Sequence, residues 1–191
     1  MHRYIKGIFD IMQSGGTMNK KQWTRIGLII IIFWIALIFY FSSQPPSTSH
    51  EQSGKFVHVF QRINDMFDIS ESSFFTKIET FIFEGLFDDK YKSMNAKVRK
   101  SAHFGIYFIL GSLVTGSSWL YTKKWFALFL MGISIPTTVA VLDEFNQGFK
   151  GRTSSISDVM LDMFGAIFGT VFVLMIIFAW VVYIRLRKRR P

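Results

Sequence analysis

The chain has no cysteine among its 191 residues, and this absence removes several kinds of site at once. Disulfide bonds, catalytic thiols, iron–sulfur clusters and zinc sites built from thiolates all require cysteine. Acidic residues are also few against basic ones, 13 against 22, so the formal net charge is +9. A nucleic-acid-binding domain would gather such charge on one soluble face. The basic residues here lie between long apolar segments instead, which argues against a nucleic-acid partner.

Four long segments hold most of the hydrophobic residues, which make up 50% of the chain. A bilayer core of about 30 Å requires roughly 20 mostly apolar residues in a helix. Tryptophan and tyrosine lie near the ends of these segments, as they do at membrane interfaces. These features predict an all-α membrane protein, a four-transmembrane-helix bundle. The predicted spans are about residues 26–43, 102–121, 125–142 and 159–184.

Lysine and arginine indicate how the spans are oriented, because these residues collect in cytoplasmic loops. If the N-terminus is cytoplasmic, the inner segments hold twelve of the 22 basic residues and one of the 13 acidic residues. The outer segments then hold the other ten basic residues and the other twelve acidic residues. We therefore expect a multipass protein of the cell membrane with both termini in the cytoplasm.

The same pattern suggests three parts of the chain. Residues 1–24 are expected to form a basic cytoplasmic N-terminal segment, residues 25–184 a single membrane domain, and residues 185–191 a basic cytoplasmic tail. An outer loop, residues 44–100, joins the first two spans. Two apolar patterns at helical spacing predict interfacial amphipathic helices in this loop. These helices would cover the spans or support a lipid headgroup site, and their apolar residues are Phe56, Phe60, Ile63 and Phe67, then Phe75, Ile78, Ile82 and Leu86.

Polar residues at the outer ends of the spans form the candidate site. Charged side chains at membrane depth are costly, so each is a functional hypothesis. At about 1.5 Å per helical residue, the outer ends of several spans bring polar groups to a similar depth. Every span must end in polar residues, so a similar depth alone is weak evidence for a site. Polar residues that share one face of a helix are stronger evidence. Lys100, His103 and Tyr107 share one face of the second span, and Asp143, Glu144 and Gln147 would be grouped if the third helix continued.

The fourth span carries a stripe of two carboxylates followed by two glycines, Asp158, Asp162, Gly165 and Gly169. Glycines at this spacing allow another helix to approach closely, so we expect both of them to serve helix packing. A carboxylate facing lipid beside such a seam would be unfavourable. We therefore expect both carboxylates to point inward, toward Lys100, His103 or Arg152.

Three sequence blocks resemble the signature blocks of the VanZ-like family of teicoplanin-resistance-associated integral membrane proteins. They are FSSQPP at 41–46, RKSAHFGIYFILG at 99–111 and DEFNQGFKGRTSSISDVMLDMFGAIFG at 143–169. The resemblance implies a small multipass membrane protein, linked in some cases to glycopeptide tolerance, without an agreed chemistry. The position of Asp162 is usually asparagine in such sequences, so this chain carries an additional acid there. The family's polar positions map onto Lys100, His103, Tyr107, Asp143, Glu144, Gln147, Arg152 and Asp158.

Several functions remain open at this point. In the first, the polar residues bind or handle an envelope lipid or a lipid-linked cell-wall group, with Lys100, His103 and Arg152 meeting an anionic phosphate. The carboxylates would position these cations or act as acid or base, but no catalytic residue is assigned and binding is favoured over catalysis. In the second, the chain is a non-catalytic membrane adaptor whose polar residues form a structural network. The third is a small-solute or ion transporter, which would require a homo-oligomer.

A metal site is conceivable at His103, Asp143, Glu144 and Asp158. One histidine with scattered carboxylates is, however, more typical of an ion-pair network. We therefore expect no metal ion and no other cofactor, and the expected partners are membrane lipids.

Overall fold

The computed structural model describes residues 19–43, 94–149 and 155–187. Within these ranges the chain forms four α-helices and no strand: α2 (Lys20–Ser42), α5 (Met94–Tyr121), α6 (Trp125–Phe149) and α7 (Ile156–Arg187). All four helices are long and apolar enough to cross a membrane. The predicted all-α fold with four spanning helices is confirmed. The predicted amphipathic helices between the first two spans lie outside the described residues.

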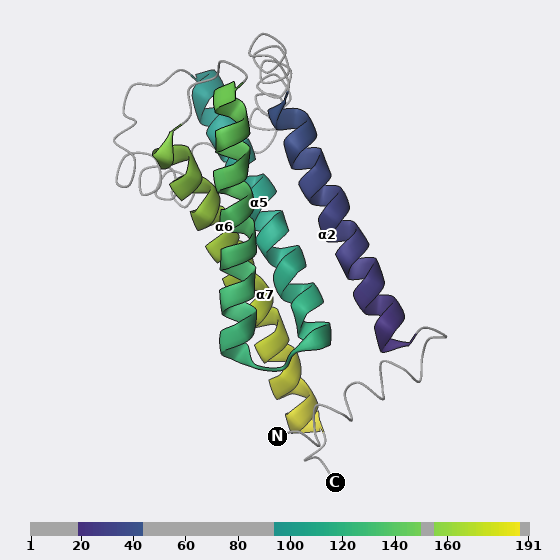
Figure 1. The fold of residues 1–191 in the computed structure, drawn as a ribbon. Coiled ribbons are helices and arrows are strands. Elements are labelled where there is room, and N and C mark those ends of the chain that lie inside the picture. The colour runs from purple at the N-terminus through teal and green to yellow at the C-terminus, as the bar shows by residue number, and fades with distance from the viewer. Residues whose placement is uncertain (1–18, 44–93, 150–154, 188–191) are drawn as a thin grey trace, which may run out of the picture.

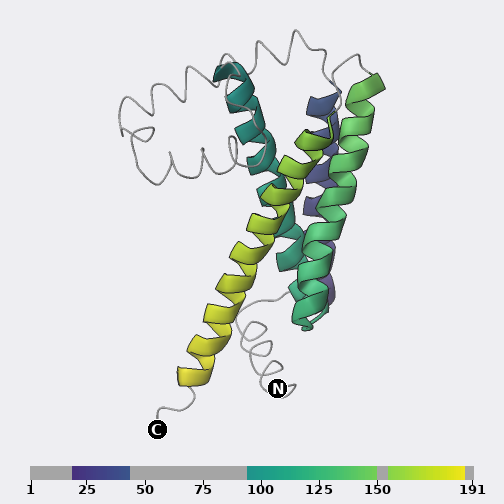
Figure 2. The ribbon, with the colours of Figure 1, turned by 90° about the vertical axis from the view of Figure 1, so that its left-hand side faces the viewer.

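The four helices form an up-and-down bundle (Figure 1). The beginning of α2, the turn between α5 and α6, and the end of α7 lie at one end of the bundle. The end of α2, the beginning of α5, the end of α6 and the beginning of α7 lie at the opposite end. α5 packs against the other three helices, whereas α2 lies at the edge of the bundle against α5 and α6. α7 is the longest helix, with 32 residues, and extends past the α5–α6 turn (Figure 2).

Glycine allows α5 and α7 to approach closely. A Cβ atom at Gly165 would overlap the backbone oxygen of Phe104, and one at Gly169 would overlap that of Phe108. Ser112 Oγ also donates a hydrogen bond to the carbonyl of Gly169 at 3.2 Å. Small residues hold membrane helices together in this way, because lipid provides little hydrophobic force between them. The α5–α7 contact therefore depends on these two positions having no side chain.

A buried polar contact lies deeper in the bundle. The hydroxyl groups of Thr115 on α5 and Thr170 on α7 are 3.2 Å apart, and both residues are fully buried. Thr115 also donates to the carbonyl of Gly111 at 2.8 Å. A Cβ atom at Gly132 on α6 would overlap both hydroxyl groups. This contact therefore fixes the positions of α5, α6 and α7 relative to one another.

A directional contact attaches the middle of α2 to α5. Trp34 Nε1 donates a hydrogen bond to the carbonyl of Ile106 on α5 at 3.1 Å.

At the beginning of α2, Asn19 and Gln22 form a reciprocal capping box, in which each side chain bonds the backbone N–H of the other residue. The helix therefore begins at Lys20, before the apolar run that predicted the span.

Large apolar side chains are exposed over the sides of all four helices. In water, such a surface would be a strong aggregation site. In a bilayer it faces acyl chains, so the exposed residues fit a membrane location. Examples from each helix are Ile32, Phe33, Ile109, Phe126, Leu130, Met175 and Phe178.

Candidate functional site

Charged residues divide the bundle into two unlike ends. All the aspartate and glutamate residues in the described ranges lie at the end where α6 finishes and α7 begins, which we call the acidic end: Asp143, Glu144, Asp158 and Asp162. At the opposite end, which we call the basic end, the described residues include no acid. Its basic residues include Lys21, Arg25, Lys123, Lys124, Arg185 and Arg187.

The acidic end gathers side chains from three helices into one polar cluster. α5 contributes Lys100, His103 and Tyr107, α6 contributes Asp143, Glu144 and Gln147, and α7 contributes Asp158 and Asp162. Six of these residues are buried, and only His103 and Asp158 are partly exposed. The structure thus brings together eight of the candidate residues named from the sequence. Arg152, the remaining one, lies outside the described residues.

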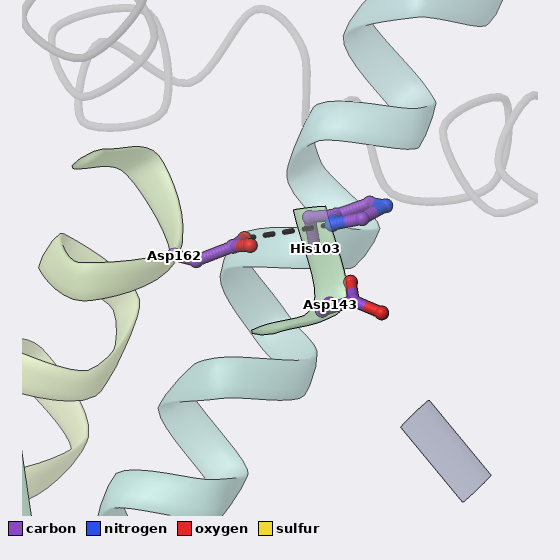
Figure 3. A group of neighbouring side chains, drawn as sticks. All are labelled: His103, Asp143 and Asp162. Atoms are coloured by element: carbon purple, nitrogen blue, oxygen red, sulfur yellow. Dashed lines mark ion pairs between the residues drawn. The ribbon is translucent and has the colours of Figure 1, made fainter. Parts of the chain in front are cut away.

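α7 meets α5 through two ion pairs in this polar cluster. Asp162 Oδ1 lies 3.5 Å from His103 Nδ1, and Asp158 Oδ1 lies 3.7 Å from Lys100 Nζ. Figure 3 shows Asp162 pointing toward the imidazole ring of His103, with Asp143 beside the same ring. Both α7 carboxylates therefore point inward, and each meets one basic residue of α5.

α6 continues as a helix to Phe149, well past residue 142, where the sequence placed the end of the span. Because of this continuation, Asp143 and Gln147 lie one turn apart on one face. Gln147 Nε2 donates a hydrogen bond to Asp143 Oδ2 at 3.0 Å. The amide of Gln147 therefore holds the Asp143 carboxylate in a fixed orientation.

Glu144 connects the end of α6 to the beginning of α7. Its Oε1 accepts a hydrogen bond from the backbone N–H of Ser155 at 2.9 Å. The Ser155 hydroxyl lies 2.6 Å from that of Ser157 and accepts from the Ser157 N–H at 3.2 Å. Sequence reasoning missed Ser155, although the spacing of Ser155 and Asp158 is that of a helix-capping box. The acid Glu144 thus also has a structural role.

A further connection joins the first family block to the third. Asn146 Nδ2 on α6 donates a hydrogen bond to Ser43 Oγ, just after the end of α2, at 3.1 Å. Neither residue was among the sequence candidates. The FSSQPP motif was the available signal, because polar residues that end a span there must find partners near the same depth.

Tyr107 carries a buried hydroxyl group whose environment is otherwise charged. The residue is 1% exposed, and its hydroxyl oxygen has no hydrogen-bond partner among the described residues. The hydroxyl lies within electrostatic range of the carboxylates of Asp143, Glu144 and Asp162. Buried polar groups are nearly always hydrogen-bonded, so this hydroxyl is expected to meet a further polar group.

The polar cluster is open to its surroundings on one side. The side chains of His103 and Asp158 are 25% and 24% exposed, whereas Asp143 and Asp162 are each 1% exposed. A ligand would therefore meet His103 and Asp158 first and the two buried aspartates behind them. An imidazole next to carboxylates can bind a cation, accept hydrogen bonds from an amine or hydroxyl, and exchange protons near neutral pH.

Comparison with known families identifies one match. The sequence model of the VanZ/LLP1 family matches residues 27–181, a range that includes most of α2, all of α5 and α6, and most of α7. No curated protein and no solved structure matches the chain.

Proposed function

The chain belongs to the VanZ/LLP1 family, and from this premise we propose that its acidic end binds an envelope lipid or a lipid-linked cell-wall group. The observation that carries the proposal is a buried polar cluster, built by three helices at one end of the bundle and open at His103 and Asp158. Charged groups at such a depth are costly to keep without a use. We propose binding, or movement between leaflets, rather than chemical turnover of the lipid.

The proposed location is the outer leaflet. The basic end carries lysine and arginine from the beginning of α2, the α5–α6 turn and the end of α7, which fits a cytoplasmic side. The acidic end would then lie at the external surface, and both termini would be cytoplasmic. Lipid-linked cell-wall groups are exposed on that external side, so the orientation and the proposed ligand agree.

Apolar side chains beside the polar cluster support an amphiphilic ligand. Phe145 and Phe149 on α6, and Ile156 and Met160 on α7, are all exposed at the acidic end. The rings of Phe145 and Phe149 pack edge to face, with their centroids 4.8 Å apart. Acyl chains would contact these side chains while the headgroup reaches the polar cluster. A ligand with one polar and one apolar part therefore suits this end better than a small solute.

The headgroup chemistry follows from the charged residues of the polar cluster, of which His103 and Asp158 are partly exposed and Lys100 and Glu144 lie behind them. The ammonium group of Lys100 and the imidazole of His103 are suited to a phosphate oxygen, as strong charge-assisted donors. The carboxylates of Glu144 and Asp158 would accept hydrogen bonds from an amine or from sugar hydroxyl groups. A phosphate-linked amine or sugar headgroup uses both kinds of residue.

Mass spectrometry of the lipids that remain on the purified full-length protein tests the proposal. The wild type should retain one phosphate-containing class above its level in the host membrane. Lys100→Met, which removes a buried charge at the polar cluster, should reduce this class to the bulk level. Lys124→Met removes an exposed charge at the basic end and should not change it. Bulk lipid composition on all three proteins would overturn the proposal and favour the adaptor function.

A further inference from the structure

Four carboxylates lie at the acidic end of the bundle. Among the side chains that the structure describes there, Asp143, Glu144, Asp158 and Asp162 face two basic groups, Lys100 and His103. Asp143 and Asp162 are the most deeply buried of the four carboxylates. An uncompensated charge in a low-dielectric environment costs several kcal/mol. Two aspartates buried beside one imidazole therefore form a place where a bound cation would be favourable.

Three ligand atoms converge in this part of the structure. One atom each of His103, Asp143 and Asp162 lies within 4.8 Å of the other two, and each residue comes from a different helix. Figure 3 shows Asp162 pointing toward the imidazole ring of His103 and the carboxylate of Asp143 near this ring. Atoms bound to one ion at about 2.1 Å lie no more than about 4.2 Å apart, so small side-chain movements would complete such a site. From the sequence, a metal site was conceivable at His103, Asp143, Glu144 and Asp158, although no metal ion was expected. The converging atoms keep His103 and Asp143 of that set and add Asp162.

Two neighbouring residues fit the surroundings of a metal site. Gln147 donates to Asp143 Oδ2 at 3.0 Å and so orients this carboxylate, as outer partners of metal ligands do. The unpartnered hydroxyl of Tyr107, one turn below His103, is buried and close to the same carboxylates. A water molecule on the ion would be a partner for this hydroxyl. The orphaned Tyr107 hydroxyl thus indicates a polar species at this point independently of the acidic residues.

We propose that His103, Asp143 and Asp162 bind a divalent transition-metal ion, with one imidazole nitrogen and one oxygen from each carboxylate as ligands. The nitrogen ligand favours Zn²⁺ or Mn²⁺ over Ca²⁺ and Mg²⁺, which prefer sites made only of oxygen. The ion ties α5, α6 and α7 together at the acidic end. The partly exposed side of His103 leaves room for an exogenous ligand. A phosphate oxygen is one such ligand, but metal binding does not depend on the proposed lipid.

The experiment uses the full-length protein, purified in mild detergent and freed of metal with a chelator. Binding of Zn²⁺ and of Mn²⁺ is measured by titration with elemental analysis, with Ca²⁺ and Mg²⁺ compared under the same conditions. We expect about one Zn²⁺ or Mn²⁺ per chain and a rise in the unfolding temperature on binding. Asp143→Asn and Asp162→Asn should each weaken binding at least about tenfold. No binding by the wild type, or equal binding of all four ions, would overturn the proposal.

Asp158→Asn is the matched control, because it removes one carboxylate from the same end but not one of the proposed ligands. The metal affinity of this variant should stay within a few-fold of the wild-type value. A loss of affinity as large as that of Asp162→Asn would indicate non-specific attraction of the ion to negative charge and would overturn the proposed site. If the ligand variants do not fold, X-ray absorption of the wild type with Zn²⁺ decides, since it must show nitrogen and oxygen neighbours. If the protein binds metal but no lipid class is enriched on it, the metal site stands and the proposed lipid function fails. If a lipid class is enriched but no metal binds, the lipid function stands and the metal site fails.

Discussion

Asp162 on α7 points at His103 on α5, with 3.5 Å between the carboxylate oxygen Oδ1 and the imidazole nitrogen Nδ1. The carboxylate is 1% exposed and the imidazole 25%. Less than one turn further along α7, Gly165 lies against the backbone of Phe104, the residue that follows His103. The ion pair and a close approach of the two helices are therefore adjacent. Any change in the α5–α7 distance would alter both, which links the packing seam to the polar cluster.

The first prediction concerns the energetic coupling of His103 and Asp162. His103→Ala should destabilise the protein by about 1–3 kcal/mol, because it leaves a buried carboxylate without its basic partner. The double variant with Asp162→Asn should recover part of this loss, so the coupling free energy should be about 1 kcal/mol or more. Unfolding of the four proteins in detergent micelles provides the measurement. Strictly additive losses would show that the two side chains act independently.

The second prediction concerns the glycine seam. Gly165→Ala and Gly169→Ala should each destabilise the bundle by about 1–3 kcal/mol, because the new methyl group forces the backbones of α5 and α7 apart. Gly105→Ala is the matched control, since a Cβ atom there has no neighbouring atom within 4 Å. Alanine is the better helix former, so this control should leave stability unchanged or slightly higher. Thermal unfolding in detergent compares the three, and equal stability of all of them would contradict the packing described.

The helices were predictable from sequence, but the pairings between them were not. Apolar runs fix the existence and approximate length of each span, and helical spacing places Lys100, His103 and Tyr107 on one face. Which acid meets which base depends on the rotation of each helix about its axis, and this rotation is set by packing. Gly165 and Gly169 indicated close approach of a helix without indicating which one. The pairs Asp162–His103 and Asp158–Lys100 therefore required the structure.

The end of the third helix was also not given by the sequence pattern. Asp143 and Glu144 ended the predicted third span because charged residues leave the bilayer core, yet the backbone stays helical to Phe149. A membrane boundary and a helix end are set by different forces, since the first depends on the cost of desolvation and the second on backbone hydrogen bonds. The Thr115–Thr170 contact was also missed, because a single threonine within an apolar run does not alter the hydrophobic pattern that predicts a span.

The third prediction concerns the attachment of α2. Trp34→Phe keeps most of the ring but loses the hydrogen bond from Nε1 to the carbonyl of Ile106. The loss should cost about 0.5–1.5 kcal/mol, as for a typical hydrogen bond. Trp180→Phe, at a residue that is 52% exposed, should cost less because no described residue accepts a hydrogen bond from it. Hydrogen exchange of α2 amides is the direct measurement, and Trp34→Phe should increase it selectively.

The last prediction tests whether the polar cluster has a function beyond holding the fold. If the family resemblance extends to glycopeptide tolerance, expression of the chain should lower the teicoplanin susceptibility of a sensitive host. Glu144→Gln is the informative variant, because glutamine keeps an oxygen that can accept the Ser155 N–H while the negative charge is lost. It should abolish the tolerance at an unchanged membrane level, as should His103→Ala wherever that variant still accumulates. Lys124→Gln, a change of an exposed residue at the basic end, is the control and should act like the wild type.

A polar cluster with only a structural role predicts a different result, in which tolerance falls only as far as protein abundance or unfolding temperature falls. If both Glu144→Gln and His103→Ala keep full tolerance, the polar cluster has no part in this function.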